Sequence, residues 1–507
     1  MSTLANLYGT SLGLLTDLYQ LTMAYGYWKQ NKAEQNGVFH LFFRKSPFKG
    51  GYTIAAGLQT AIEYLESFHF SNSDIEYLST LTGNDDKPLF EPAFLDYLSE
   101  LKLTLNIDAI PEGTVVFPHQ PLVRVEGPML QAQIIETPLL NLINFQTLIA
   151  TKSARICRAA MGEPVLEFGL RRAQGIDGAL TATRAAFIGG AAATSNILAG
   201  KLYGIPVRGT HAHSWVMSFD TEMDSFNSYA DAMPNNCVFL VDTYDTLEGV
   251  RKATEVGKRL REDGHEMVGI RLDSGDLAYL SIEARKILDE AGFPDAKIVA
   301  SNDLDEHLIE SLKRQSAQVS VWGVGTKLAT AFEQPALGGV YKLAAIEETP
   351  GHWTPKIKLS EQLIKTSTPG KLQVRRYIKT GRASADMIFN ELDGKPNNAT
   401  FVDPLDPSHQ RVVSDKDEYE SLLVPVIRKG KTVYDLPTLE SIQTRTHDQL
   451  AMFHPTILRL DNPHKYPVGL EKTLYDLKAE LMIQHRKREK ISAQADAGQG
   501  TDQGEGQ

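Results

Sequence analysis

Cysteine is almost absent from this chain of 507 residues, which contains only Cys157 and Cys237. The two do not form a CxxC pair, so the sequence indicates neither a disulfide framework nor a structural zinc site. Long apolar runs are missing as well. No stretch approaches the roughly 18 uninterrupted apolar residues of a membrane span, and residues 12–15 are too short for the apolar part of a signal peptide. We therefore expect a cytoplasmic protein that does not contact a membrane.

The chain also has no excess of basic residues. Lys and Arg number 52 against 63 Asp and Glu, which gives a formal net charge of −11. An acidic chain is a poor candidate for binding nucleic acid through its phosphates, so we expect no nucleic-acid partner. A local basic pocket for a phosphorylated small molecule is compatible with this balance. The length and the 42% hydrophobic content suggest about three domains with large cores.

The middle of the chain contains a regular alternation of short apolar runs and helix-length segments. The runs are rich in β-branched residues, as buried strands are. A strand and a helix every roughly 20 to 40 residues are typical of a parallel α/β structure, such as a (β/α)8 barrel or an irregular relative. The expected strands are residues 237–241, 267–270, 297–300 and 319–322, and the expected helices between them are residues 246–263, 277–291 and 305–315.

Polar side chains stand at the ends of these expected strands. Asp242 follows the first run, Arg271 and Asp273 follow the second, and Ser301 with Asn302 follows the third. In a parallel barrel the carboxyl ends of the strands meet at one mouth, so these groups should gather there. Taken alone, Asp273 fits a helix N-cap better than a ligand.

The last strand is followed by a glycine-rich segment that contains Gly323, Gly325 and Thr326. Glycines let backbone N–H groups approach an anion at the start of a helix, which makes a phosphate nest one interpretation. An ordinary strand-to-helix turn is the other. The segment matches neither the Walker A pattern nor the dinucleotide fingerprint.

Two polar clusters lie further upstream, each after an apolar run that is typical of a buried strand. In the first, Phe168 stands close to Arg171 and Arg172, and an aromatic face beside guanidinium groups suits a flat anion. The second contains His211 and His213, and a histidine at a strand end is a candidate nucleophile or general base. A core Phe with surface Arg residues and two structural histidines would explain the same residues without a site.

The two ends of the chain are organised differently from the middle. We expect a helix over residues 16–28, a strand over 39–44, a hairpin from 115–117 and 122–125, and a strand-rich segment over 355–450. The last of these should return to complete the first domain. The predicted domains are residues 1–135 (N-terminal α/β domain), 136–355 (α/β barrel), 356–482 (C-terminal segment returning to the first domain) and 483–507 (disordered tail).

Six motifs in one order connect these features: TDLYQLTM at residues 16–23, FFRK at 42–45, EFGLRRAQG at 167–175, GTHAHS at 209–214, RLDSGD at 271–276 and GVGT at 323–326. Together they closely resemble the nicotinate phosphoribosyltransferase family, and the similarity extends from about residue 10 to about residue 475. The resemblance implies a type II phosphoribosyltransferase fold, an irregular α/β barrel plus an α/β domain built from both chain ends. It also implies a homodimer with shared active sites.

The resemblance implies a chemistry as well. Enzymes of this family transfer ribose 5-phosphate from phosphoribosyl pyrophosphate to the ring nitrogen of nicotinate, which gives nicotinate mononucleotide and pyrophosphate. We therefore expect Mg²⁺ as a cofactor and ATP as a co-substrate, with ATP hydrolysis coupled through a phosphohistidine. The reaction is the first step of NAD salvage from nicotinate.

The motif match assigns roles to residues. It places the phosphorylated imidazole at His213, because the family pattern GTxAH leaves His211 at the variable position. Phe168 should stack on the pyridine ring, and Tyr19 of the neighbouring subunit should cover the ring's other face. Arg171 is expected to reach the carboxylate of nicotinate or the adjacent phosphates.

The sugar and its phosphates should occupy the other strand ends. By the same resemblance, Asp242 and Asp273 are acceptors for ribose hydroxyls or magnesium-bound pyrophosphate, and Arg271 is a partner for pyrophosphate or carboxylate. Ser301, with Asn302, should complete the phosphate cradle formed by residues 323–326. Further positive charge, in part from across the dimer interface, is expected from Arg44, Lys365 and Lys371. Solvated surface charge explains these three equally well.

Three alternatives stay open. One is the nicotinamide-specific relative, which carries an Asp at the position that resembles Ser195 here; the absence of charge at Ser195 favours nicotinate. Another is a metal-dependent hydrolase, if His211 and His213 share one strand face as a ligand pair. The last is a noncatalytic regulator that binds a nucleotide.

Overall fold

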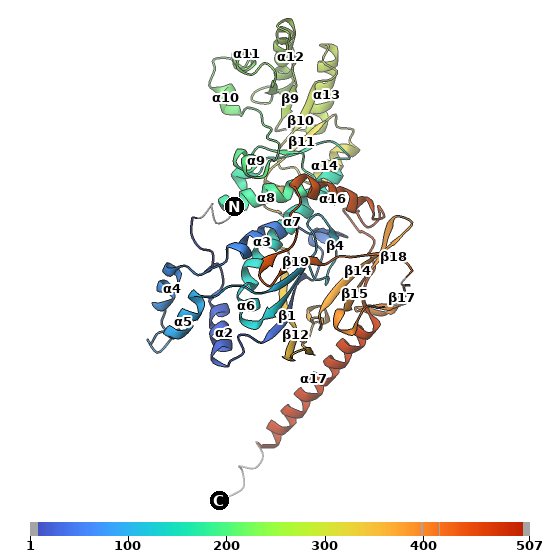
Figure 1. The fold of residues 1–507 in the computed structure, drawn as a ribbon. Helices are drawn as coiled ribbons and strands as arrows, with labels where there is room; N and C mark the ends of the chain where they lie inside the picture. The colour runs from blue at the N-terminus through green and yellow to red at the C-terminus, as the bar shows by residue number, and fades with distance from the viewer. Residues whose placement is uncertain (1–8, 397–398, 415, 500–507) are drawn as a thin grey trace, which may run out of the picture.

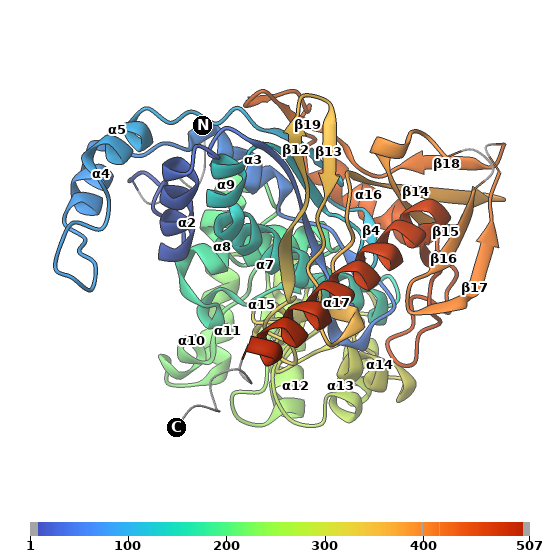
Figure 2. The same ribbon diagram turned by 90° about the horizontal axis from the view of Figure 1, so that it is seen from below.

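A computed structural model describes residues 9–396, 399–414 and 416–499 of the chain, which form three large sheets and the helices around them (Figures 1 and 2). The parallel sheet and its helices form the upper part of the molecule in Figure 1, and the other two large sheets lie below it. None of the helices in the described residues combines the length and the apolar character that crossing a membrane requires.

The parallel sheet contains the strands expected in the middle of the chain, with nearly the expected bounds. Its strands are β6 (Val165–Glu167), β7 (Ala193–Thr194), β8 (Val238–Leu240), β9 (Gly269–Leu272), β10 (Lys297–Ala300) and β11 (Val321–Val324). The helices of this region are α8 (Gly175–Ile188), α9 (Ile197–Tyr203), α10 (His213–Met217), α11 (Glu222–Ala232), α12 (Thr246–Glu262), α13 (Leu277–Glu290), α14 (Glu306–Arg314) and α15 (Thr326–Ala329), with the 3-10 turn η2 (Leu170–Arg172) after β6.

The strand order in this sheet is β7-β6-β11-β10-β9-β8, and every pairing is parallel. Each strand therefore neighbours the next one along the chain, except at β7 and β8, and the last strand pairs with the first. This is the cyclic order of an irregular β/α barrel that is open between β7 and β8. The α/β fold expected from the sequence is confirmed.

Residues 206–211 span the seam between β7 and β8. On the β7 side, the backbone N–H and C=O of Thr194 hydrogen-bond to this segment at 3.0 and 2.9 Å. On the β8 side, the backbone N–H of Leu240 donates to Nε2 of His211 at 3.2 Å. The apolar run before residue 208 was expected to be a buried strand, but it makes only a single parallel bridge to Thr194. A side chain thus satisfies the edge of β8 where a neighbouring strand would otherwise do so.

A seven-stranded antiparallel sheet combines strands from the beginning, the middle and the end of the chain. Its order is β13 (His352–Pro355), β12 (Gly339–Thr349), β1 (Asn36–Phe43), β5 (Val123–Pro128), β3 (Asn106–Ala109), β19 (Val424–Arg428) and β20 (Lys431–Thr432). The chain therefore returns to its first domain after the barrel, as the fold expectation requires. The return begins at β12, inside the range 136–355 that was predicted for the barrel.

The hairpin predicted from residues 115–117 and 122–125 is wrong. β4 (Val115–Val116) pairs with β2 (Thr53–Ile54) in a separate two-stranded sheet, whereas β5 pairs with β1 and β3. The intervening residues 117–120 form a turn, but the two runs pair with different strands on either side of it, and Gln120 in this turn is buried. Its side-chain oxygen accepts the N–H of Phe117 at 2.9 Å, and its amide donates to Asp386 of the C-terminal sheet at 2.6 Å.

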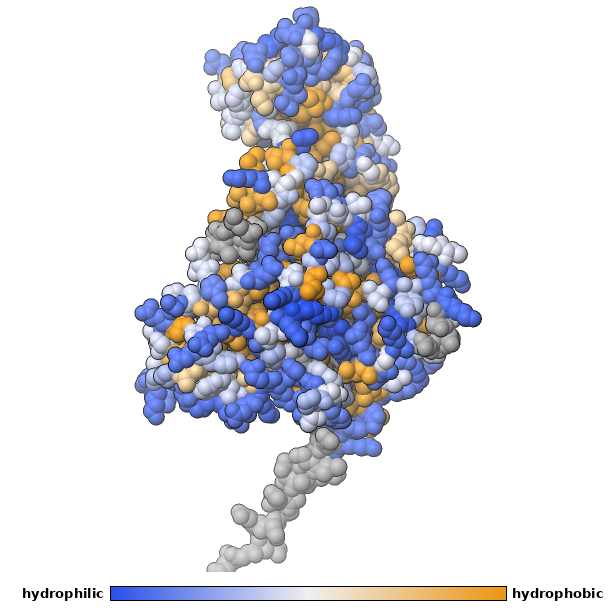
Figure 3. Space-filling model, viewed as in Figure 1, coloured by the Kyte–Doolittle hydropathy of each residue, from blue (hydrophilic) through white to orange (hydrophobic). Residues whose placement is uncertain are grey.

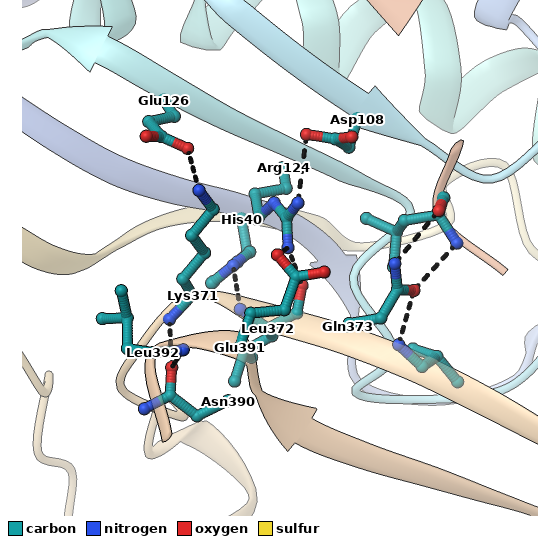
Figure 4. Close-up of polar contacts among 12 residues, drawn as sticks. His40, Asp108, Arg124, Glu126, Lys371, Leu372, Gln373, Asn390, Glu391 and Leu392 are labelled. Carbon is teal, nitrogen blue, oxygen red and sulfur yellow. Dashed lines mark hydrogen bonds and ion pairs between the residues drawn. The ribbon is translucent and has the colours of Figure 1, made fainter. Parts of the chain in front are cut away.

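The third sheet is formed by the C-terminal segment and joins the first domain through buried polar contacts (Figure 4). The backbone N–H of Leu372 donates to His40 of β1 at 3.2 Å. Arg124 of β5 donates to the carbonyl of Leu372 and pairs with Glu391, and Lys371 pairs with Glu126 at 2.6 Å. The order of the sheet is β17 (Asp406–Val412), β16 (Thr400–Asp403), β21 (Val468–Glu471), β15 (Arg382–Asn390), β14 (Leu372–Lys379) and β18 (Glu418–Ser421).

Helices complete the first domain and the C-terminal segment. The long helix α7 (Glu136–Ala159) packs against β2 and β12 of the first domain and against α8 and α14 of the barrel, so it connects the two. The others are α2 (Leu18–Lys29), α3 (Leu58–Ser67), α4 (Asn72–Ser79), α5 (Pro92–Ser99), α6 (Met129–Ile134), α16 (Leu439–Ala451) and α17 (Lys472–Gln499), with the 3-10 turns η1 (Pro47–Lys49), η3 (Leu363–Lys365) and η4 (Glu391–Asp393).

Helix α17 extends away from the rest of the molecule in Figure 1. It reaches residue 499, so it continues through much of the range 483–507 that was predicted to be a disordered tail. Residues 500–507 of that range lie outside the described residues. The domain bounds drawn from the sequence otherwise stay predictions.

Candidate active site

A pocket of about 300 Å³ opens at the carboxyl ends of the parallel strands. Phe168 and Arg171 follow β6, Ser195 follows β7, and Arg271 belongs to β9. The gathering of these side chains at one mouth is the arrangement that the alternation of strands and helices predicts. The residues around the pocket are Phe168, Leu170, Arg171, Ser195, Gly209, Thr210, His211, Ala212 and Arg271.

The turn that carries Phe168 is fixed by a buried carboxylate. Glu167 is only 2% exposed, and its Oε1 atom accepts the backbone N–H of Gly169. Its Oε2 atom accepts hydrogen bonds from the hydroxyls of Thr183 at 2.9 Å and Thr194 at 2.7 Å. Glu167 therefore points away from the pocket, between β6, α8 and β7, and it orients the turn without facing the ligand.

The glycines of the 323–326 segment make room for this turn. A Cβ atom on Gly323 would come within 2.7 Å of the Phe168 ring, and one on Gly325 would come within 3.0 Å of the Phe168 carbonyl oxygen. The backbone N–H of Phe168 also donates to the carbonyl of Val324 at 2.8 Å. Within one chain, the close approach of the Phe168 turn therefore explains why residues 323 and 325 are glycines. Thr326 begins α15, a helix of one turn.

The strand ends of β9 and β10 are joined by a polar network around Arg271. Its Nε donates to the hydroxyl of Ser301 at 2.8 Å, its Nη1 to the hydroxyl of Thr210 at 2.9 Å, and its Nη2 to Asp273 at 2.9 Å. The Ser301 hydroxyl in turn donates to Asp273. These contacts fix a guanidinium and a carboxylate side by side at the mouth of the barrel. Asn302, beside them, has φ +100°, an unusual conformation for a residue with a side chain.

Asp273 is not the helix cap that its pattern suggested. The N-cap of α13 is Asp276, whose Oδ1 accepts two backbone N–H groups. Burial alone would raise the pKa of Asp273, but the hydrogen bond from Ser301 and the charge of Arg271 outweigh it and lower the pKa. Asp273 is therefore ionised at neutral pH and retains its negative charge for a ligand.

Asp242, at the end of β8, supplies a second carboxylate. Its Oδ2 accepts the backbone N–H of Asp273 at 2.9 Å and the hydroxyl of Ser274 at 2.6 Å. Its Oδ1 is buried and has no hydrogen-bond partner within the residues that the structure describes. A buried carboxylate oxygen without a partner is costly, so this atom is available to a hydroxyl group or a cation.

His213 is the first residue of α10, and its ring lies between Thr243 and the carboxylate of Asp273. Its Nδ1 lies 3.0 Å from the hydroxyl of Thr243, and its Nε2 lies 3.8 Å from Oδ2 of Asp273. The side chain is 40% exposed. One ring nitrogen is thus held by a hydroxyl, while the other faces a carboxylate from an accessible position.

His211 has a different environment, although it is only two residues away. It is 8% exposed, its ring packs against Tyr229 at a centroid distance of 4.8 Å, and its Nε2 is occupied by the N–H of Leu240. Burial lowers the pKa of His211 to about 4. The two histidines therefore do not form a ligand pair on one strand face, because residue 213 begins a helix and residue 211 fills the seam. Within the described residues, no three His, Cys, Asp or Glu side chains are grouped to hold a metal ion.

Four basic or aromatic residues expected near the site lie elsewhere in the single chain. Tyr19 is on α2 and is 51% exposed. Arg44 lines a separate cavity between the first domain and the C-terminal sheet, and Lys365 lies on the surface in the turn η3. Lys371 pairs with Glu126, so its charge is already matched. Roles for the first three require a second subunit and stay predictions.

The small hydroxyl residues of the site were not found from the sequence. Thr210, Thr243 and Ser274 hold Arg271, His213 and Asp242, and each of them lies next to or close to a residue that was singled out. Threonine and serine are too common in loops for a pattern to mark them. Thr210 and Ser274 lie inside the motifs GTHAHS and RLDSGD, whereas proximity to a strand end was the signal available for Thr243.

Comparison with known proteins places these observations in a family. Three family models match the chain: the nicotinate phosphoribosyltransferase N-terminal domain over residues 14–144, the nicotinate phosphoribosyltransferase family over residues 164–381, and the corresponding C-terminal domain over residues 371–478. The nicotinate phosphoribosyltransferase of Bacillus subtilis (strain 168) is 44% identical over 486 residues, which cover 94% of this chain and 96% of that protein.

Solved structures agree. The crystal structure of human nicotinic acid phosphoribosyltransferase superposes with a TM-score of 0.81 at 32% identity, and the match covers 92% of this chain and 99% of that one. The nicotinate-nucleotide pyrophosphorylase of Pyrococcus furiosus, at 22% identity and a TM-score of 0.64, shares the fold. Fold, site and matches together define an α/β phosphoribosyltransferase. More narrowly, the chain belongs to the nicotinate phosphoribosyltransferase family.

Proposed function

We propose that the protein transfers ribose 5-phosphate from phosphoribosyl pyrophosphate to the ring nitrogen of nicotinate, with coupled hydrolysis of ATP. The products are nicotinate mononucleotide and pyrophosphate, which makes the reaction the first step of NAD salvage from nicotinate. The observation that supports this most is the adjacency of two subsites at one barrel mouth. Phe168 and Arg171 suit a flat anion, and Arg271 with Asp273 suits a phosphorylated sugar.

In the ring subsite, the Phe168 ring would stack on the pyridine and Arg171 would hold its carboxylate through the planar guanidinium fork. Ser195 lines the same pocket and carries no charge. A carboxylate bound there would therefore lie beside a positively charged side chain, and no negatively charged side chain among the described residues lines this pocket. This arrangement favours nicotinate over nicotinamide.

In the sugar subsite, Asp242 and Asp273 present carboxylate oxygens to the ribose hydroxyls or to a cation bound to pyrophosphate. Mg²⁺ fits this pair, since it prefers oxygen ligands and is usually held by one or two carboxylates together with substrate phosphates. The unpartnered Oδ1 of Asp242 is the atom best placed to bind it. Bound there, Mg²⁺ would neutralise charge that develops on the departing pyrophosphate. Arg271 stands beside the same carboxylates and would contact the pyrophosphate oxygens.

For the coupling to ATP, His213 is the residue that we propose to carry the phosphoryl group. A nucleophilic imidazole needs one unprotonated nitrogen and a partner that orients the ring. The hydroxyl of Thr243 lies at Nδ1 of His213, which leaves Nε2 accessible. Asp273 is close enough to stabilise the ring when it becomes positively charged. His211 lacks this freedom because its Nε2 already accepts a backbone hydrogen bond.

We also propose a homodimer in which each site is completed by the other subunit. The rim of the Phe168 pocket and the helices beside it carry exposed apolar side chains, and Figure 3 shows apolar surface where α9 lies in Figure 1. Contiguous apolar surface of this kind marks protein interfaces. On the first domain, Tyr19 is exposed together with its apolar neighbours Leu15 and Leu18. The exposed apolar residues around the barrel mouth are Leu170, Ile176, Ile197, Leu198, Leu202 and Met217.

The experiment that tests the function compares nicotinate, nicotinamide and quinolinate as acceptors for phosphoribosyl pyrophosphate, with and without ATP. Chromatography of the mononucleotide products gives substrate and coupling together. We expect nicotinate mononucleotide, formed faster when ATP is present, and loss of product in Asp273→Asn. If purified protein forms no nicotinate mononucleotide from nicotinate, neither with ATP nor without it, the proposed function fails. A nicotinamide product instead would support the nicotinamide-specific alternative.

A further inference from the structure

The largest cavity described here lies away from the barrel mouth, between the first domain and the C-terminal sheet. It has a volume of about 730 Å³ and shares no residue with the pocket around Phe168. Pockets for small molecules typically measure about 300 to 1,000 Å³, so the size is that of a ligand site and not of a packing defect. Of its lining residues, Arg44 alone was expected to reach the active site of a second subunit, and the others have no role in the reaction proposed above.

The walls of this cavity are mostly apolar. Phe117 comes from the segment between β4 and β5, Ile388 from β15, and Tyr466 and Leu470 from the region of β21. All four are buried, which gives the cavity a fixed shape. Apolar walls gain free energy from covering an apolar molecule and not from holding a lone ion.

The charged side chains around the cavity are almost all positive. They include five Lys or Arg side chains and a single carboxylate, that of Asp403. Asp403 is already paired with Lys465 at 2.6 Å. The remaining positive side chains are Arg44, Lys45, Lys49 and Lys478. The cavity therefore selects for a negative charge.

Lys478 of α17 brings one of these charges into the interior. Lys478 is only 9% exposed. Its Nζ contacts two neutral oxygens, the Thr368 hydroxyl at 3.2 Å and the Thr366 carbonyl at 3.5 Å. Within the described chain it has no carboxylate partner. Burial lowers the pKa of Lys478 to about 8, so the ammonium is still charged at neutral pH. Helix α17 contacts β16 and β21 of the C-terminal sheet, which forms the other wall of the cavity.

Two further polar atoms in the lining lack partners. Nε2 of His119 and Nε of Arg44 are buried without a hydrogen bond to any described residue. Burial is the main cause that lowers the pKa of His119 to about 4, and the positive charges of Lys478 and Arg44 add to it while Asp403 opposes them. His119 also has φ +69°, held by the hydrogen bond from its backbone N–H to the Phe43 carbonyl. Strained backbone and unpartnered buried polar atoms occur together at ligand sites more often than elsewhere.

We propose that this cavity binds a small organic anion with an apolar body, whose anionic head is held by Lys478 and His119. The apolar body lies against Phe117, Ile388 and Leu470. The site is separate from the barrel mouth and goes beyond the transfer reaction. The wall also includes Gln334, which follows α15 and the 323–326 segment in the chain, so an occupant of the cavity contacts this part of the protein. The side-chain oxygen of Gln334 accepts the backbone N–H of Phe48 at 2.9 Å.

Octanoate is a suitable probe, because it has one carboxylate and an apolar chain that fits the volume. We expect calorimetry to show saturable binding of octanoate to the full-length protein, with octanol and inorganic phosphate each binding at least about tenfold more weakly. Lys478→Met preserves length and apolar packing but removes the charge. It should weaken octanoate binding by about ten- to a hundredfold, since the free energy of a hydrogen bond to a charged group corresponds to a change in affinity of that size. Lys472→Met is the matched control, because Lys472 lies on the same helix but pairs with Asp476 at the surface.

A second measurement uses the unaltered protein and so does not depend on a variant's folding. Acetylation of lysines followed by mass spectrometry should show that octanoate protects Lys478 and leaves Lys472 unprotected. No binding up to millimolar octanoate, equal binding of octanol or phosphate, or equal binding by Lys478→Met would overturn the proposal. Displacement of octanoate by nicotinate would assign the probe to the barrel pocket and would also overturn it. None of these outcomes depends on product formation, so the proposed function stands or fails separately.

Discussion

Nε2 of His213 lies 3.8 Å from Oδ2 of Asp273, whereas His211, two residues earlier, has its Nε2 bound to the backbone of β8. The two histidines of one short motif thus have different tasks. His211 replaces a missing strand partner at the barrel seam. His213 stands at the mouth, beside an ionised carboxylate that Arg271 and Ser301 hold in place. This difference makes His213, and not His211, the candidate for phosphorylation.

From this relationship we predict that ATP phosphorylates His213. Incubation with ATP labelled at the γ-phosphate should give an adduct that is labile in acid and stable in base, and His213→Ala should lack it. ATP hydrolysis should then be uncoupled from transfer, while some product still forms because the ring and sugar subsites remain. The measurement is label retained on the protein after gel filtration.

The control for this experiment is His211→Ala. It removes the acceptor for the Leu240 N–H, so we expect lower thermal stability with labelling of the folded fraction preserved. The contrary result, labelling that survives in His213→Ala and disappears in His211→Ala, would reverse the assignment.

We predict a preference for nicotinate over nicotinamide that depends on Arg171. A charge-assisted hydrogen bond contributes about 1.5 to 3 kcal/mol, and the exposure of Arg171 in the single chain argues for the lower end of that range. Arg171→Leu should therefore reduce kcat/KM for nicotinate by about tenfold and leave that for nicotinamide nearly unchanged. Ser195→Asp should act in the same direction by placing a negative charge in the pocket.

Arg172→Leu is the matched control, because Arg172 is also exposed on the same turn but does not line the pocket. Equal catalytic efficiency of the unaltered enzyme on the two substrates would refute the prediction. So would an equal effect of the Arg171 and Arg172 substitutions.

Much of the barrel could be predicted because its signals are local. The expected helix 246–263 is α12 and the expected helix 277–291 is α13, each within a residue of the observed end. Apolar runs of β-branched residues between turns mark buried parallel strands regardless of their partners. The end of each strand then fixed where Asp242 and Asp273 would lie, and so the mouth was predictable as well.

The remainder depends on contacts between distant segments. Nothing in residues 115–125 shows that β4 pairs with β2 and β5 with β1, because strand pairing is decided by the whole sheet and not by the turn alone. The orientation of Glu167 is set by Thr183 and Thr194, which lie on other elements. Two further aromatic residues of α2, Tyr25 and Trp28, pack against Phe94 within the chain, whereas Tyr19 of the same helix is exposed.

We predict that the buried pair of Glu112 and Arg184 is required for stability. The carboxylate of Glu112 accepts two hydrogen bonds from Arg184, at 2.8 and 2.7 Å, and joins the first domain to α8 of the barrel. Removing one charge of a buried pair leaves the other uncompensated, which typically costs about 3 to 5 kcal/mol. Glu112→Gln should lower the free energy of unfolding by that order, measured by urea denaturation. Asp231→Asn, which breaks an exposed pair with Arg259, should change it by less than about 1 kcal/mol.

The same pair predicts a dependence on pH. Burial alone would raise the pKa of Glu112, but Arg184 and the backbone N–H groups of Gly57 and Gln59 outweigh it and lower the pKa below 4.5. A depressed folded-state pKa contributes stability above the unfolded value, and that contribution is lost as pH falls through the folded value. The difference in unfolding free energy between the unaltered protein and Glu112→Gln should therefore be constant at neutral pH and shrink below about pH 4. A difference that grows on acidification would contradict this.

Our last prediction concerns the dimer, in which Tyr19 of one subunit should cover the ring bound at Phe168 of the other. Tyr19 is 51% exposed and does not line the Phe168 pocket of its own chain, so a contribution to that pocket has to come from a second copy. An aromatic contact is worth roughly 0.5 to 1.5 kcal/mol beyond burial. Tyr19→Ala should therefore raise the KM for nicotinate by about two- to tenfold with little loss of thermal stability, whereas Tyr77→Ala, an exposed aromatic on α4, should change neither.

Subunit complementation decides whether the site is shared. Mixing Tyr19→Ala and Phe168→Ala proteins after dissociation should form hybrid dimers that hold one intact site and one site with both defects. Activity at low nicotinate should then exceed the mean of the two parents, because the intact site retains both aromatic faces. Native mass spectrometry establishes that hybrids have formed, since the two variants differ in mass. If hybrids are present and activity stays at the parental mean, Tyr19 and Phe168 act within one chain, or Tyr19 does not reach the ring, and the shared site is refuted.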